Sequence, residues 1–263
     1  MSEKILKIGL FIMCLLFITG CEKVELNLED IKTNVEALKT NDVDRVLMTS
    51  ALSTTEYFGE LTEYYDWDLE KLKIDKENIN EIDGAYDFNL AASKKYAYFV
   101  GSAKNSDELK KDLDKYFKKF ENVLKEEYEG YIVYIASKNN EEAFKTLKDN
   151  AYANVFNGLT YLNDEDIETM LGINKDLVNE HLVGLPSFIT SASQYVIIKP
   201  VSGKTKEVKD FMTKYMESVQ EQWDTYLPAQ AELVRNRLET QHGDYLIYII
   251  SQDNEQVINT IKK

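Results

Sequence analysis

Cysteine and histidine are scarce in this sequence. Its 263 residues include two cysteines, Cys14 and Cys21, and two histidines, His181 and His242. Zinc and other transition metals are held mostly by clustered Cys and His side chains, so we expect no metal site and no cofactor. A Ser-His-Asp hydrolase would need one of these histidines beside a strained serine turn, and the sequence contains no Gly-x-Ser-x-Gly pattern.

Basic residues are also outnumbered. Lysine and arginine total 31 against 46 aspartates and glutamates, which gives a formal net charge of -15. Such a surface repels phosphates of nucleic acids and anionic lipid headgroups, so we expect no nucleic acid partner. The Gly-x-Gly-x-x-Gly and Walker patterns that bind nucleotide phosphates are missing as well.

The N-terminal residues have the pattern of an export signal. Lys4 and Lys7 precede an uninterrupted apolar run from Ile8 to Ile18. A charged segment followed by a short apolar one is typical of secretory signal peptides. The run is about half as long as the roughly 20 residues of a membrane-spanning helix, so we expect a signal rather than a permanent transmembrane anchor.

The end of this apolar run, Ile18-Thr19-Gly20-Cys21, resembles the bacterial lipobox. The resemblance implies cleavage between Gly20 and Cys21 and attachment of diacylglycerol to the Cys21 thiol. Two acyl chains anchor a protein stably, whereas one alone is marginal. We therefore expect a lipoprotein on the extracytoplasmic face of the cell membrane, with the lipid bilayer as its partner through acylated Cys21. An uncleaved signal anchor is the alternative.

Two stretches of the remaining chain are similar to each other. The clearest match joins Tyr131–Ser137 to Tyr245–Ser251, and further matches keep the same order along the chain. Self-similarity of this kind indicates an internal repeat. The predicted organisation is a signal peptide at 1–20, the lipidated cysteine with a tether and N-terminal helices at 21–57, a first repeat at 58–149 and a second repeat at 150–263.

Each repeat is predicted to contain a short helical opening, a strand, a long helix, a β-hairpin and a closing helix. The first strands are Tyr96–Val100 and Tyr195–Lys199. The last strand, Tyr245–Ile250, is apolar at every position, which is typical of a strand in the middle of a sheet. We expect an α+β fold of two related tandem units, with helices packed on one face of a mixed or antiparallel sheet.

Two helices are expected before the first repeat. Leu28, Ile31, Val35 and Leu38 have helical spacing behind Asn27, which is placed to cap the helix. A second pattern uses Val43, Val46, Leu47 and Ala51 as its apolar stripe.

The second repeat resembles a known type of domain. Gly184-Leu185-Pro186, the strand Tyr195–Lys199 and the strand entry Gly243-Asp244-Tyr245 look like an uncharacterised DUF-type domain of Gram-positive bacterial lipoproteins. The resemblance covers roughly Phe156–Lys263, and the first repeat is a more divergent match. It implies an architecture and brings no catalytic residue.

Aromatic residues are the best indication of a binding surface. Trp223 and Tyr226 lie beside a stretch that only the second repeat contains, so they are the candidate binding residues. We interpret His181 as a packed histidine on a short helix and His242 as an exposed turn residue.

We therefore expect a non-catalytic interaction or scaffolding lipoprotein, not an enzyme, whose partner is an envelope protein or wall polymer. A cell-wall or peptide hydrolase and a small-solute-binding lipoprotein are the open alternatives.

Overall fold

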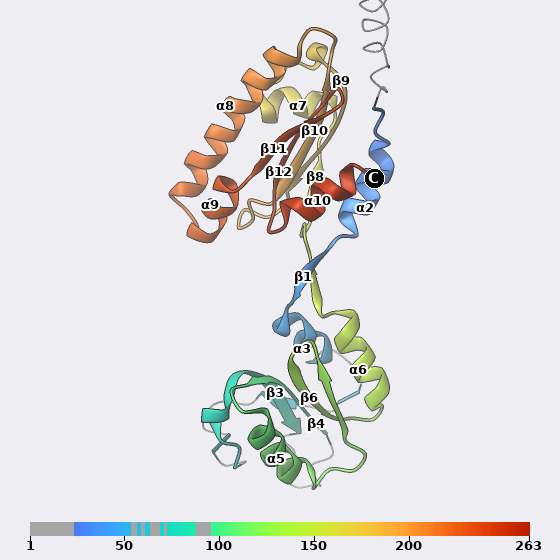
Figure 1. The fold of residues 1–263 in the computed structure, drawn as a ribbon, viewed down its shortest axis with the longest axis vertical. Coiled ribbons are helices and arrows are strands. Elements are labelled where there is room, and N and C mark those ends of the chain that lie inside the picture. The colour runs from blue at the N-terminus through green and yellow to red at the C-terminus, as the bar shows by residue number, and fades with distance from the viewer. Residues whose placement is uncertain (1–23, 54–56, 59–60, 64–68, 71–72, 88–95) are drawn as a thin grey trace, which may run out of the picture. The chain divides into compact units, whose positions relative to one another are not determined.

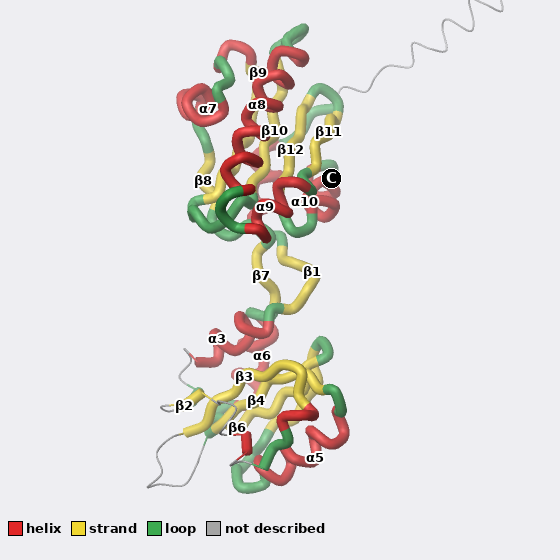
Figure 2. The backbone as a smooth tube through the Cα atoms, turned by 90° about the vertical axis from the view of Figure 1, so that its left-hand side faces the viewer, coloured by secondary structure: helices red, strands yellow, loops and turns green. Residues whose placement is uncertain are grey.

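The computed structural model describes residues 24–53, 57–58, 61–63, 69–70, 73–87 and 96–263, which form two compact units (Figure 1). The C-terminal unit consists of the described residues up to Leu38 together with Asn154–Lys263, and the inserted unit is Lys39–Ala153. The chain thus leaves the C-terminal unit after one helix and later returns to it. Strands β1 (Lys39–Val43) and β7 (Tyr152–Asn154) pair where it leaves and returns (Figure 2).

The C-terminal unit is built on a five-stranded sheet with the order β11-β12-β10-β9-β8, in which all neighbours are antiparallel. Strand β12, buried at every position, lies between two neighbours, as its apolar sequence predicted. The strands are β8 (Leu159–Tyr161), β9 (Val178–Pro186), β10 (Gln194–Pro200), β11 (Leu238–His242) and β12 (Tyr245–Ile250).

Helices cover both faces of this sheet (Figure 1). Helices α7 (Asp164–Leu171), α8 (Thr205–Asp224) and α9 (Pro228–Arg235) pack on one face, and a 3₁₀ turn, η2 (Lys175–Leu177), follows α7. Helices α2 (Leu28–Glu36) and α10 (Asn254–Ile261) pack on the other. The expectation of helices on one face was therefore wrong. Strands β10 and β12 are apolar on both sides, and each side needs its own cover.

The inserted unit has a sheet of the same strand order, β5-β6-β4-β3-β2, again antiparallel. Helix α5 covers one face, whereas α3 and α6 cover the other. The strands are β2 (Leu61–Glu63), β3 (Ile79–Asp87), β4 (Ala97–Ala103), β5 (Leu124–Tyr128) and β6 (Tyr131–Ala136). The helices are α3 (Arg45–Ser53), η1 (Lys76–Asn78), α5 (Ser106–Phe117) and α6 (Asn140–Asp149).

The α+β fold with helices packed on antiparallel sheets is thus as predicted. The observed division of the chain differs from the predicted ranges at the N-terminal side, because the segment 21–57 contributes α2 to one unit and α3 to the other. In both units the helix that precedes the sheet packs against the helix that follows it: α2 lies against α10, and α3 lies against α6.

Helix α2 begins where its sequence predicted. Asn27 is the N-cap, and its side-chain oxygen accepts a hydrogen bond from the Asp30 N–H. Side-chain caps of this kind satisfy backbone donors that the first helical turn leaves open. Ile31 and Val35 are buried against the sheet, so the predicted stripe is the packed face.

Helix α3 differs from its predicted stripe. Val46 is 56% exposed and Leu47 is 38% exposed, whereas Met48 and Leu52 are fully buried. The helix begins at Arg45, after Asp44, whose carboxylate accepts a hydrogen bond from the Leu47 N–H at 3.0 Å. This start point turns Met48 and Leu52 toward the core. The two faces were ambiguous in sequence because both carry apolar residues.

Replacing Met48 with alanine tests this orientation. Met48→Ala should lower the free energy of unfolding by about 2–5 kcal/mol, because it leaves a cavity in the core under α3. Val46→Ala on the exposed face is the matched control and should change it by less than about 0.5 kcal/mol. Urea denaturation of both variants measures the difference, and a larger loss for Val46→Ala would contradict the observed face.

Candidate functional site

Three polar side chains form a row across the sheet of the C-terminal unit. Glu180 on β9 lies opposite Lys199 on β10, and the register of β10 with β12 brings Tyr245 next to Lys199. Ile197 lies two residues from Lys199 on β10, and Ile247 lies two residues from Tyr245 on β12, so both share the face of the row. They are fully buried under α2 and α10. The row therefore lies on the α2 face of the sheet.

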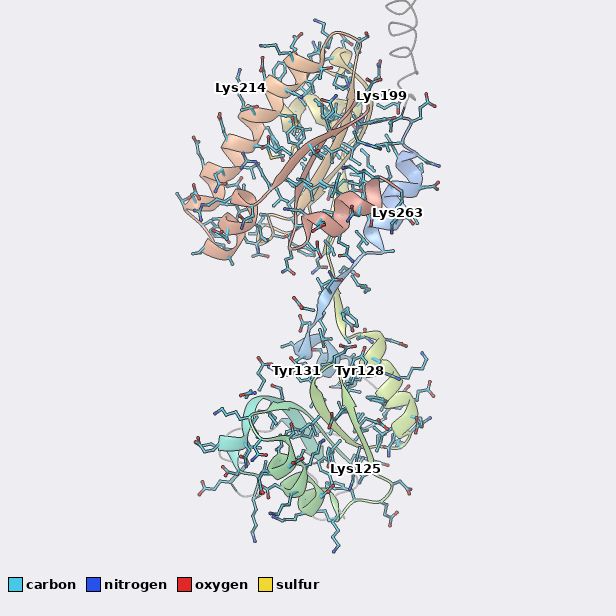
Figure 3. The ribbon with its side chains drawn as sticks, in the orientation of Figure 1. Lys125, Tyr128, Tyr131, Lys199, Lys214 and Lys263 are labelled. Carbon is cyan, nitrogen blue, oxygen red and sulfur yellow. The ribbon has the colours of Figure 1, made fainter. Side chains whose placement is uncertain are left out.

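Short contacts join the three groups. The Lys199 ammonium lies 2.5 Å from one Glu180 oxygen, and the Tyr245 hydroxyl donates to the other at 2.6 Å. The hydrogen bond to Glu180 raises the pKa of Lys199. Burial raises the pKa of Tyr245, and the bond to Glu180 adds to that shift. Both groups are thus protonated at neutral pH, so Lys199 (labelled in Figure 3) remains a cation and Tyr245 a donor.

The row also holds the N-terminal segment. The backbone N–H of Leu26 donates to the Tyr245 hydroxyl at 3.4 Å, so this hydroxyl joins the segment before α2 to strand β12. A Cβ atom at Gly243, in the β11–β12 turn, would lie 2.6 Å from the Cβ of Val24. Gly243 also has a φ of +57°, which side chains rarely adopt, so glycine is required there for two reasons. Val24 and Leu26 are therefore both held against the sheet.

A related group occurs on the same face of the sheet in the inserted unit. The Tyr131 hydroxyl donates to the Glu81 carboxylate at 3.2 Å, as Tyr245 does to Glu180. Here the cation comes from helix α3, since the Arg45 guanidinium lies 3.6 Å from Glu81 and donates to the Ile82 carbonyl at 3.0 Å. In each unit a tyrosine on the strand before the closing helix holds a glutamate beside a cation.

A cavity of about 610 Å³ lies at the N-terminal segment of the C-terminal unit. Its lining comes from the stretch before α2, from helix α2, from His242 and from the end of α10. Charged groups of both signs line it, namely Glu25, Asp30, Lys262 and Lys263. The two lysines are exposed, and Figure 3 labels Lys263. The cavity is polar and belongs wholly to this unit.

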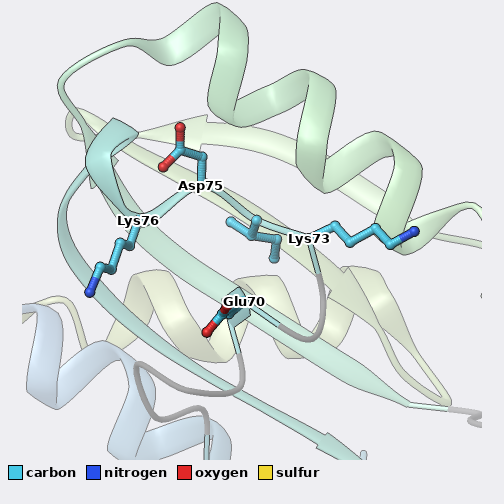
Figure 4. A pocket seen from close by; sticks show the side chains of 5 residues that line it. Glu70, Lys73, Asp75 and Lys76 are labelled. Atoms are coloured by element: carbon cyan, nitrogen blue, oxygen red, sulfur yellow. The ribbon is translucent and has the colours of Figure 1, made fainter.

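A second cavity, of about 390 Å³, lies in the inserted unit (Figure 4). The side chains of Lys73 and Lys76 extend in different directions there, and Asp75 caps the turn η1. These charged groups do not converge on one position that a ligand could occupy. The cavity is lined by Glu70, Lys73, Ile74, Asp75 and Lys76.

The two aromatic residues expected to form a binding surface have different environments. Trp223 is only 5% exposed and packs in the core beneath α8, so it offers little surface for stacking. Tyr226 is 52% exposed, and its ring lies 5.7 Å from that of Trp223. Trp223 thus supports Tyr226, which alone of the pair is presented to a partner.

The histidines lie in strands. His181 is on β9 rather than on a helix, and its Nε2 lies 2.9 Å from the Asp164 carboxylate. His242 is half-buried at the end of β11 beside the larger cavity. Within the ranges that the structure describes, no group of three His, Cys, Asp or Glu side chains could hold a metal ion.

The predicted cleavage and lipidation residues, Gly20 and Cys21, lie outside the described residues. Among the helices of residues 24–263 that are described, none is both long and apolar enough to cross a bilayer.

Comparison with known proteins recognises one part of the chain. Residues 151–251 match the family model described as Domain of unknown function (DUF4358), which confirms the expected DUF-type domain over this stretch. The match covers the whole C-terminal sheet with α7, α8 and α9, and it excludes α2 and α10. No curated protein and no solved structure matches the chain significantly.

The polar row can be tested by removing one oxygen. Tyr245→Phe deletes the hydroxyl that bridges Glu180, Lys199 and the Leu26 N–H, so the free energy of unfolding should fall by about 1–3 kcal/mol. Tyr248→Phe, on the opposite face of the same strand, is the matched control and should cost less. Equal losses in urea denaturation would show that the row contributes nothing specific.

Proposed function

We propose that this protein is a lipoprotein held on the extracytoplasmic face of the cell membrane through acylated Cys21, after cleavage between Gly20 and Cys21. Its two units would serve as a non-catalytic interaction or scaffolding module for an envelope protein or wall polymer.

The observation that carries the anchoring is that Val24 and Leu26, close to Cys21 in the chain, lie against the folded sheet. Val24 contacts Gly243 and the Leu26 N–H donates to Tyr245, only a few residues after the cysteine of the lipobox-like sequence. A lipid on Cys21 would therefore restrain a folded unit directly, with very little chain between them. This arrangement suits a protein whose place of action is the membrane surface.

We further propose that the two units arose by duplication. In support, the two sheets have the same strand order, and the similar segments Tyr131–Ser137 and Tyr245–Ser251 form the equivalent strands β6 and β12. The register agrees as well. Glu81 faces Ser102 on β4, as Glu180 faces Lys199 on β10, and each glutamate accepts from the tyrosine that begins its β6 or β12 strand.

Exposed apolar side chains support the interaction part of the proposal. Ile189 is 84% exposed and the adjacent Phe188 is 55% exposed, both in the connection between β9 and β10. Single exposed apolar residues are common on protein surfaces, but neighbouring large ones are typical of contact sites. Tyr226 and Met170 are further exposed apolar residues of the same unit.

Metabolic labelling tests the anchor. Cells grown with a labelled fatty acid should label the wild-type protein, and Cys21→Ser should abolish the label and release the protein from the membrane fraction. Cys14→Ser, inside the expected signal peptide, is the matched control and should remain labelled. Loss of label from neither variant, or an unlabelled wild type, would refute the lipoprotein assignment.

Photo-crosslinking in cells tests the interaction role. A photoreactive amino acid at position 189 should give a discrete adduct with an envelope component, because Ile189 presents an uncovered apolar side chain. The same amino acid at position 206 is the control, since the Lys206 side chain is 89% exposed but polar. The scaffolding role fails if position 189 gives no adduct beyond that of position 206 while the purified protein degrades wall polymer or peptide.

A further inference from the structure

The N-terminal segment of the C-terminal unit limits how far this unit can move from a lipid on Cys21. Three peptide steps separate Cys21 from Val24, and each spans at most about 3.8 Å, so the two Cα atoms are within about 11 Å of each other. From Val24 the chain follows the sheet: Val24 packs on Gly243, and Leu26 is joined to Tyr245. Residues Ile31 and Val35 then bury α2 in the core.

This reach is comparable to the thickness of the headgroup layer. A bilayer of about 40–45 Å with a hydrocarbon core of about 30 Å has headgroup layers of about 5–8 Å on each side. With its acyl chains in the hydrocarbon core, Cys21 lies at the inner boundary of this layer. Val24 can then extend only a few ångström beyond the headgroups, and the surface around Val24 must lie against them.

We propose that one surface of the C-terminal unit faces the phospholipid headgroups, an inference that rests on the proposed acylation of Cys21. This membrane-facing surface consists of the segment Val24–Asn27, the turn between β11 and β12, and the end of α10 at Lys262 and Lys263. Its parts are contiguous, because the same segment contacts Gly243 and lines the 610 Å³ cavity together with both lysines.

Chain length, and not charge, sets this orientation. The surface carries Lys262 and Lys263 but also Glu25 and Asp244, Asp30 lines the cavity beside it, and the whole chain has a formal net charge of -15. Such a mixture gives no strong attraction to anionic lipids, while groups of both signs around an open cavity are compatible with zwitterionic headgroups. The orientation should therefore be insensitive to salt, unlike that of a protein held by a basic patch.

Energy transfer to the membrane measures the orientation. The mature chain, residues 21–263, is coupled at Cys21 to a maleimide lipid and bound to phosphatidylcholine vesicles that carry a headgroup acceptor dye. A fluorescent amino acid replaces Asp244, in the turn, or Gln252, beyond the other end of β12. Both positions are exposed, and they lie beyond opposite ends of β12, whose six residues span about 20 Å.

The donor at position 244 should transfer energy about twofold or more efficiently than the donor at position 252, at low and at high salt. Inserting about 15 Gly/Ser residues between Cys21 and Val24 should make the two signals similar, because the tether no longer restrains the unit. Equal transfer without the insertion, or stronger transfer from position 252, would overturn the proposal. Because the lipid is attached chemically, this result is independent of whether cells acylate Cys21, which the labelling experiment decides.

Discussion

The C-terminal unit depends on strand β12, which is buried on both of its faces. Its six side chains alternate between the core under α8 and the core under α2 and α10. Burial of one large apolar side chain stabilises a fold by about 1.5–3 kcal/mol. Exposing either face of β12 to water would lose this stabilisation for each of the three side chains on that face. The sheet therefore requires two helical layers, and one of the helices, α2, comes from before the inserted unit.

This requirement explains the course of the chain. Helix α2 covers a sheet whose strands come more than a hundred residues later in the chain. The inserted unit lies between them in sequence, and β1 and β7 pair where the chain leaves and re-enters the C-terminal unit. It also fixes the segment before α2, where Val24 and Leu26 lie on the β11–β12 hairpin. The need to cover a buried strand thus places the N-terminal residues on a defined surface. An anchor on Cys21 would orient the unit through them.

The polar row is compatible with this core because its charges are satisfied in place. Lys199 has a side chain that is only 11% exposed, and an unpaired ammonium there would carry a large desolvation cost. Glu180 and the Tyr245 hydroxyl both contact it, and the hydroxyl also accepts from Leu26. The equivalent Tyr131 and Glu81 in the inserted unit use an arginine from helix α3. The two polar groups thus share a tyrosine and a glutamate but use different cations.

Local signals in the sequence predicted much of this fold. Asn27 caps α2 as expected, because a side-chain cap depends only on neighbouring residues. The uniform apolar sequence of β12 indicated a central strand, because this signal too lies within one short segment. Strands β3 and β9 were missed because polar residues such as Glu81, Glu180 and His181 interrupt their alternation, and these residues are satisfied only by partners on other elements.

The candidate site shows the same limit. Trp223 and Tyr226 are three residues apart on the chain, yet one lies in the core and the other on the surface, which spacing alone did not distinguish. The contact of Leu26 with Tyr245 joins residues 219 positions apart, and no local sequence pattern predicts such a contact. The one local indication of the polar row was Tyr245, a residue with a polar hydroxyl at the start of the apolar strand β12.

Amide hydrogen exchange tests whether α2 is an integral layer of the C-terminal unit. The amides of Ile31–Val35 should exchange as slowly as those of β12 and lose their protection in the same cooperative opening, since both belong to one core. Fast exchange in α2 while β12 remains protected would show that the sheet is stable without it. The N-terminal segment would then hold no fixed position on the unit.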